Sequence, residues 1–155
     1  MRSTRNDLPS AAKQTTLEVF APLVMAAVDL SLATKQAHWN LRGPAFLSVH
    51  TMLDGLADQL AEHVDALAER MVQLGGVAVG TVQEVASRSF LAAYPTDLRA
   101  VSEHLSALAD RFAALGAKAR QATDRLGDDA AGADVLTAFC RDLDKALWFL
   151  EAHLG

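Results

Sequence analysis

Apolar residues recur at helical spacing along four long stretches of this 155-residue chain. A helix with about 3.6 residues per turn collects such residues on one face, and that face is buried when helices pack together. The pattern predicts helices over residues 10–39, from just after Pro44 to about Gln73, over 96–126 and over 134–154. The chain is also rich in alanine and leucine and has only 4 prolines. We therefore expect an all-α fold built as a four-helix bundle.

Individual residues set the expected starts and interruptions of these helices. Ser10 and Thr96 are typical N-cap residues for the first and third helices. Pro22 lies inside the first apolar stripe and lacks the backbone N–H that a helix interior uses. One kinked helix through Pro22 is the preferred interpretation, and the alternative is a helix that begins at Pro22.

The connection between the second and third predicted helices, residues 73–95, is long and contains Gly75, Gly76 and Gly80. Within it, Thr81 and Glu84 have the spacing of a capping box, which predicts a short helix over 81–87. A long crossover in the middle of four helices is typical of ferritin-like bundles.

Length, charge and hydropathy limit the class of protein. The length suits one domain, which we divide into a flexible tail at 1–9 and a bundle at 10–155. Residues 1–14 lack an apolar signal core, and no unbroken apolar run approaches a membrane span. These features predict a cytoplasmic protein without membrane contact. The formal net charge of −5 opposes binding to DNA, whose phosphates require lysine or arginine partners.

The second predicted helix carries a polar stripe that is rotated by roughly 130° from its apolar stripe. His50 and Asp54 lie one turn apart on this stripe, and so do Asp65 and Glu69, so each pair can reach one ion. Asp54 and Asp65, however, lie about 16 Å apart along the helix. Bonds between ligand and metal are only about 2.0–2.3 Å long. One chain therefore cannot bring both pairs to the same ion.

A two-fold axis near Gln59–Leu60 would pair this helix antiparallel with its copy and create two identical sites. An antiparallel hairpin would carry His38, from the end of the preceding helix, to the height of His50. Imidazole and carboxylate ligands suit iron, and also zinc or manganese. The alternative interpretation is that these are solvated surface side chains, which is the commoner case for any single pair. The expected ligands are His38, His50 and Asp54 from one chain and Asp65 and Glu69 from its mate.

The chain contains no Glu-x-x-His sequence. Ferritin-like di-iron proteins that bind metal inside the bundle use this motif at positions facing the core. Its absence argues against a di-iron centre within one bundle, and leaves the site between subunits as the metal candidate.

These residues stand in motifs that resemble those of the Dps mini-ferritins, the DNA-protection-during-starvation family. The motifs are KQAHWNLRGPAF at 35–46, His50 with Asp54, DALAER at 65–70, QLGGVAVGT at 73–81 and RDLDKALWFLEAHL at 141–154. The resemblance implies a ferroxidase site between subunits, a homo-oligomer in the form of a hollow dodecamer, and a short central helix at the subunit two-fold. It also implies that iron is the cofactor: hydrogen peroxide or dioxygen oxidises Fe(II), and Fe(III) is stored as a mineral, which protects DNA from oxidative damage.

Further roles are expected for residues near the predicted ligands. Trp39 follows His38, and is expected either to act as a radical sink beside the iron or to pack at the end of the hairpin. Lys35 is expected to pair with an acid at the interface, and Arg70 to orient a carboxylate of the site. The resemblance implies three-fold pores lined by acids, although a solvated acidic loop is the alternative. The pore candidates are Asp128, Asp129 and Asp134.

Binding and compaction of DNA is the alternative function. Basic N-terminal tails often bind DNA in the Dps family, and Arg2 and Arg5 are the candidates here. The alternative protein is a structural nucleoid component that coats and compacts DNA, with a weak metal site or one occupied by zinc. The intact ligand set favours the ferroxidase, and the weakly basic tail disfavours the nucleoid protein.

Overall fold

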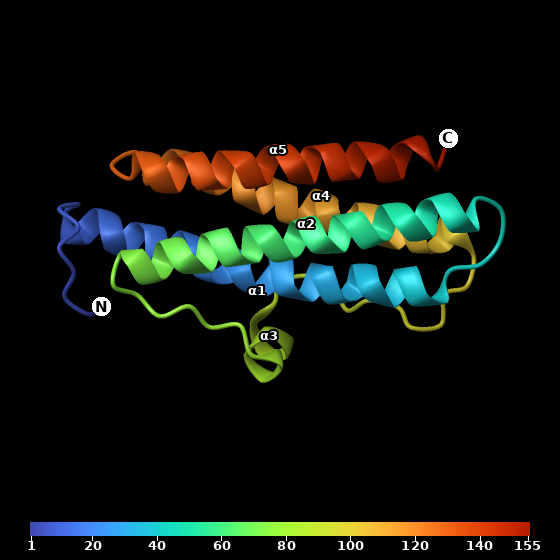
Figure 1. Cartoon of the computed structure of the whole chain (residues 1–155), viewed down its shortest axis with the longest axis horizontal. Helices are drawn as coiled ribbons and strands as arrows, with labels where there is room; N and C mark the ends of the chain where they lie inside the picture. The colour runs from blue at the N-terminus through green and yellow to red at the C-terminus, as the bar shows by residue number, and fades with distance from the viewer.

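Four long helices lie side by side in a bundle, and a fifth, short helix lies outside it in the computed structural model, which describes all 155 residues (Figure 1). There is no β-sheet; one isolated bridge joins Arg42 and Ala100. The elements are α1 (Ser10–Asn40), α2 (Phe46–Gln73), α3 (Val82–Arg88), α4 (Val101–Thr123), a 3-10 turn η1 (Asp124–Leu126) and α5 (Ala130–Ala152). The expected all-α, ferritin-like bundle with an extra helix in the crossover is confirmed.

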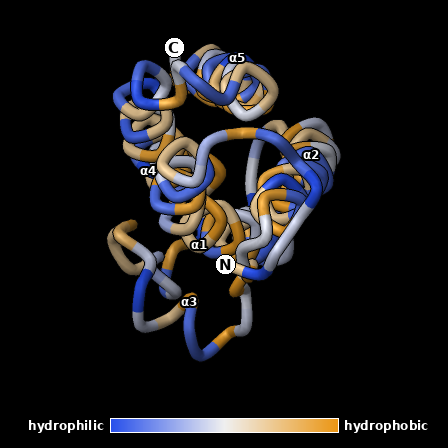
Figure 2. The backbone as a smooth tube through the Cα atoms, turned by 90° about the vertical axis from the view of Figure 1, so that its left-hand side faces the viewer, coloured by the Kyte–Doolittle hydropathy of each residue, from blue (hydrophilic) through white to orange (hydrophobic).

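The direction of the helices follows from the lengths of their connections. Short turns join α1 to α2 and α4 to α5, so each of these pairs is antiparallel (Figure 1). The long segment between α2 and α4 runs the length of the bundle and carries α3, which lies beyond α1 when the bundle is seen from its end (Figure 2). The end of α1, the start of α2 and the start of α4 therefore meet at one end of the molecule, and the end of α2 lies at the other.

The core is a single cluster of 29 buried residues from all four long helices. Phe20, Phe112 and Phe139 are each at most 2% exposed and come from α1, α4 and α5. Burying one such side chain contributes roughly 1.5–3 kcal/mol to stability. Helix α1 is long and apolar enough to span a membrane by composition alone, but more than half of its most apolar window is buried in the bundle.

Helix α1 is continuous through Pro22, so the alternative of a helix that begins at Pro22 is wrong, and the expected kink stays a prediction. The cap differs from the prediction, because Pro9 occupies the N-cap position and Ser10 is the first helical residue. For α3, Thr81 is the N-cap as expected, but its side chain makes no capping hydrogen bond. Glu84 pairs instead with Arg88, at 3.1 Å, so the predicted capping box does not form.

Helix α4 begins at Val101, and the predicted start at Thr96 is wrong. The backbone before it is used for another contact: Arg42 N–H donates to Arg99 O (2.8 Å), and Val101 N–H donates to Arg42 O (3.1 Å). Glu103 then accepts hydrogen bonds from the backbone N–H groups of Arg99 and Ala100. This bridge fixes the start of α4 against the α1–α2 turn.

Helix α5 begins at Ala130, four residues before the predicted start, because Asp129 caps it. The Asp129 carboxylate accepts from Gly132 N–H (2.9 Å), from Thr16 Oγ1–H (2.9 Å) and from the guanidinium of Arg70. Burial alone would raise the pKa of Asp129, but the hydrogen bonds from Arg70, Gly132 and Thr16 outweigh it and hold the pKa below its usual value. One buried carboxylate thus joins α1, α2 and α5.

Replacing Asp129 by alanine should lower the free energy of unfolding by about 3–5 kcal/mol, because it removes a helix cap and leaves the mostly buried Arg70 guanidinium without its partner. The matched control is Asp144→Ala, which breaks the exposed pair between Asp144 and Arg120 and should cost at most ~1 kcal/mol. Urea unfolding followed by circular dichroism measures both. Equal losses in the two variants would contradict a structural role for the buried carboxylate.

Candidate metal centre

The turn between α1 and α2 brings His38 and His50 together. Helix α1 ends at Asn40, α2 begins at Phe46, and the connection contains two residues with positive φ, Gly43 (116°) and Ala45 (62°). The φ value of Gly43 lies in the region that glycine adopts without steric cost. Because the two helices run antiparallel from this turn, the last turn of α1 faces the first turns of α2.

The two histidine rings stack, with their centroids 3.7 Å apart and an angle of 20° between the ring planes. Each ring also bonds to the backbone of the other residue: His38 Nδ1 lies 2.8 Å from His50 O, and His50 Nδ1 lies 2.9 Å from His38 O. A carbonyl oxygen only accepts hydrogen bonds, so each Nδ1 carries a proton. In the neutral rings both Nε2 atoms then keep a lone pair for a metal ion, which is the arrangement of metal-binding histidines in general.

Asp54 adds a carboxylate to this pair. Its Oδ1 lies 3.9 Å from His38 Nε2 and accepts a hydrogen bond from the ammonium group of Lys35. That hydrogen bond is the main reason that the pKa of Asp54 lies below its usual value. Lys35 therefore pairs with an acid of the candidate site within its own chain, and the position of this pair at a subunit interface stays a prediction. In this state the ammonium group supplies the positive charge that a metal ion would bring.

The second half of the predicted ligand set lies farther along α2. Asp65 and Glu69 are exposed carboxylates one helical turn apart, and Asp65 is about 16 Å from Asp54 along the helix axis. No three histidine, cysteine, aspartate or glutamate side chains within this one chain lie close enough to hold a metal ion. The chain thus presents two separated, incomplete ligand sets, and the structure does not bring all five predicted ligands together.

The predicted roles of Arg70 and Trp39 differ from what the structure shows. Arg70, expected to orient a carboxylate of the site, instead binds Asp129, because the side chain turns toward the start of α5. Trp39 is 66% exposed, so it does not pack at the hairpin end within this chain. The radical-sink interpretation of Trp39 stays a prediction.

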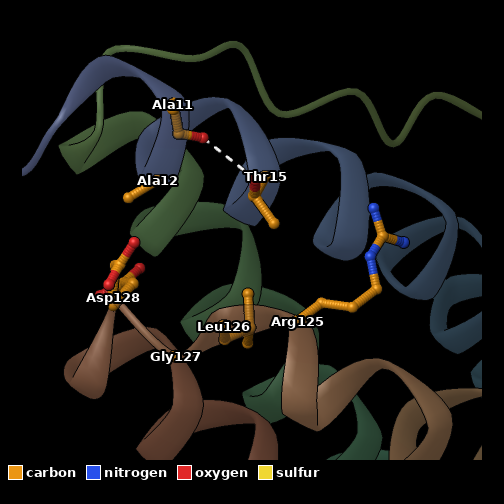
Figure 3. A pocket seen from close by; sticks show the side chains of 8 residues that line it. Ala11, Ala12, Thr15, Arg125, Leu126, Gly127 and Asp128 are labelled. Carbon is orange, nitrogen blue, oxygen red and sulfur yellow. Dashed lines mark hydrogen bonds between the residues drawn. The ribbon is translucent and has the colours of Figure 1, made fainter.

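The acidic residues proposed for a pore separate into buried and exposed groups. A cavity of about 170 Å³ lies between the first turn of α1 and the α4–α5 connection, with Asp128 and Arg125 among its lining residues (Figure 3). Asp128 and Asp134 are exposed, and for them the pore stays a prediction. Asp129 is only 1% exposed, and its oxygens are taken up by Arg70, Thr16 and Gly132. The prediction that Asp129 lines a pore is therefore wrong.

The N-terminal segment has specific contacts with the end of α2. Arg2 N–H donates to Gly75 O (2.7 Å), and Arg2 Nη2 donates to Val72 O (2.9 Å). Lys13, which is mostly buried, donates from Nζ to Asn6 O at 2.6 Å. A cation at the carbonyl end of a helix is favourable. Arg2, a candidate for DNA binding, thus already has partners in its own chain, whereas Arg5 is exposed.

The sequence predicted that His38 and His50 lie together at the α1–α2 hairpin, as they do, but not how their rings are oriented. The two hydrogen bonds between rings and backbone join residues 12 positions apart across a turn, and no local periodicity reports them. The only signal was the placement of His38 and His50 on either side of a Gly-Pro turn.

Comparisons with known proteins agree on one family. Residues 23–155 match the family model described as "Ferritin-like domain". A relative from Agrobacterium fabrum, named "DNA protection during starvation protein", is 49% identical over 153 residues, which are 97% of this chain and 94% of the relative.

Solved structures of the same family have this fold. "Mycobacterium smegmatis Dps tetragonal form" matches with a TM-score of 0.93 and 28% identity over 99% of this chain and 94% of that one. "DpsA14 from Streptomyces coelicolor" matches with a TM-score of 0.93 and 33% identity, covering 99% and 92% of the two chains. The relatives extend over nearly the whole sequence, including both halves of the candidate site, and this chain belongs to the Dps family of ferritin-like proteins.

Proposed function

We propose that this protein is a Dps-type ferroxidase and iron-storage protein, whose sites form between two subunits related by a two-fold axis. The observation that carries the proposal is the pair of hydrogen bonds that fixes His38 and His50 with both Nε2 atoms free, beside the ionised Asp54. Iron is the substrate of these sites. The stored mineral, the dodecamer and a cytoplasmic location are part of the same proposal and are supported by membership of the family.

The symmetry of the site follows from the positions along α2. Two copies of α2 can pack antiparallel around an axis near Gln59–Leu60. Two residues that face each other across this axis then have numbers that add up to about 119. His50 of one subunit then faces Glu69 of the other, and Asp54 faces Asp65. His38 joins through its stacking with His50. Each site receives two imidazoles and three carboxylates, and the pair of subunits holds two such sites.

The ligand set suits the oxidation of iron. Imidazole and carboxylate groups bind Fe(II) and also stabilise the higher charge of Fe(III), which favours loss of an electron at the site. In the balanced reaction two Fe(II) ions each give one electron to hydrogen peroxide, the O–O bond breaks, and two protons complete two water molecules. Because peroxide is consumed by two electrons, the hydroxyl radical of a one-electron reaction is avoided, and nearby DNA is protected.

Lys35 sets the charge of the site before iron binds. Its ammonium group neutralises Asp54 in this structure, so an incoming Fe(II) ion exchanges for a cation that is already present. This ion pair reduces the repulsion among the three carboxylates when the subunits meet, because one of them is already neutralised. Entry of iron separates Lys35 from Asp54, and Asp54 becomes a ligand.

Replacing one ligand should slow the oxidation of Fe(II) by hydrogen peroxide by at least about tenfold. Replacing a residue that only holds a metal ligand in place already lowers metal affinity or activity by about tenfold or more. The variants are His38→Ala and Asp65→Ala, loaded with Fe(II) without oxygen and then mixed with peroxide. His153→Ala is the control, since this exposed histidine bonds only to its own helix, through Phe149 O. Oxidation at the wild-type rate in both ligand variants would contradict the proposal.

DNA protection by this protein is proposed to act through iron and peroxide rather than through a coat of protein on DNA. Each chain carries a net charge of −5, and Arg2 is hydrogen-bonded to Val72 and Gly75. Contacts with DNA phosphates depend on several lysine or arginine side chains and weaken steeply with salt. Few such side chains are free near the N-terminus, where only Arg5 is exposed without these contacts.

In a gel-shift assay the assembled protein should therefore leave duplex DNA unretarded at moderate salt. Arg2→Ala with Arg5→Ala should not change the result, because neither side chain carries binding. Retardation at low salt that disappears in this double variant would show instead that the tail leaves α2 and binds DNA. That outcome would favour the structural nucleoid protein as a second function.

A further inference from the structure

Leu47 is an exposed apolar residue on the face of α2 that carries the metal ligands. It is 71% exposed and lies in the first turns of the helix, two turns before Asp54. Val72 is 41% exposed and lies two turns after Asp65. A separation of seven residues returns to within about 20° on a helix, so Leu47 and Val72 share the stripe of the two aspartates. Within one chain nothing covers either side chain fully.

Leu47 and Val72 are related by the same two-fold axis as the predicted metal ligands. Their numbers add up to 119, as do those of Asp54 with Asp65 and of His50 with Glu69. An antiparallel pairing that completes the metal ligands therefore places Leu47 of one subunit opposite Val72 of the other, one turn beyond His50 and Glu69. The contact lies on the side of each site that is away from the two-fold axis.

The surface around Val72 is hollowed into a shallow groove. An open groove of about 420 Å³ lies beside Glu69, and its apolar lining consists of Ala68, Val72 and Ala78. Arg2 forms another part of its wall and is held there by hydrogen bonds to Gly75 O and Val72 O. The groove is thus built partly by the N-terminal segment and lies directly beside a proposed iron ligand.

We infer that Leu47 of one subunit packs into this groove of a second copy of the chain, against Val72, and closes each shared iron site on the side away from the two-fold axis. The inference rests on the proposed function, because it uses the pairing that brings the two ligand sets together. The occupant is a second copy because the same pairing that joins the ligands aligns an exposed leucine with the apolar part of this groove, at Val72.

This contact has two consequences for the site. An apolar pair beside the ligands excludes water there, which strengthens the interactions between the iron and its carboxylates. The contact also gives the N-terminal segment a role in the interface, since Arg2 lines the groove that the partner's leucine enters. Loss of this segment would then weaken the pairing of subunits.

A disulfide between the two positions tests the contact without relying on activity. In a Cys140→Ser background, which removes the only native cysteine, Leu47→Cys and Val72→Cys are combined in one chain. Mild oxidation of the assembled protein should yield covalent dimers on a non-reducing gel, because the two Cα atoms should lie within about 7 Å across the two-fold. Each single cysteine variant is a control, since two copies of residue 47 would lie about 37 Å apart along the paired helices.

Efficient cross-linking of the double variant, with monomers in both single variants, is the expected result. Monomers throughout, or equal cross-linking in the single variants, would overturn the inference. The reduced double variant is also assayed for oxidation of Fe(II), so that the two claims are separated. Fast oxidation without cross-linking leaves the ferroxidase standing and removes the leucine contact, whereas cross-linking without oxidation supports the contact and counts against the ferroxidase.

Discussion

The paired hydrogen bonds between His38 and His50 are the interaction on which the candidate site depends. Each Nδ1 donates to the backbone carbonyl of the other residue, which fixes the two ring orientations and leaves both Nε2 atoms free. The arrangement requires a tight turn between α1 and α2, and Gly43 with its positive φ is part of that turn. The bridge from Arg42 to the start of α4 then ties the same turn to the rest of the bundle.

The second constraint is the length of α2. The helix separates Asp54 from Asp65 by about 16 Å, so a rigid chain cannot use both at one ion, and the proposed site needs a second subunit to complete it. The buried Asp129 holds the far end of α2 in place through Arg70, next to Glu69 in the sequence. The two ends of one helix are thus anchored separately, one by histidines and one by a buried ion pair, which suits a site divided between two subunits.

Much of the fold and of the ligand-bearing face of α2 could be predicted from the helical periodicity of the sequence. The predictions that were wrong have physical causes. The stripes on α1 and α2 and the spacing of His50, Asp54, Asp65 and Glu69 depend only on helix geometry, and these elements were placed correctly. The start of α4 was missed because Thr96 is a good cap by type, whereas the backbone near it bonds to Arg42. Asp129 was interpreted as an exposed acid because its partners, Thr16 and Arg70, are distant in sequence.

The most direct test of a site shared between subunits is to mix His38→Ala and Asp65→Ala after dissociation and reassembly, and to measure oxidation of Fe(II) by peroxide. With equal amounts and random pairing, half of the two-fold pairs are mixed, and each mixed pair has one site with all five ligands. The account predicts recovery of about one quarter of the wild-type rate. A mixture as inactive as its two components would contradict sites formed between subunits.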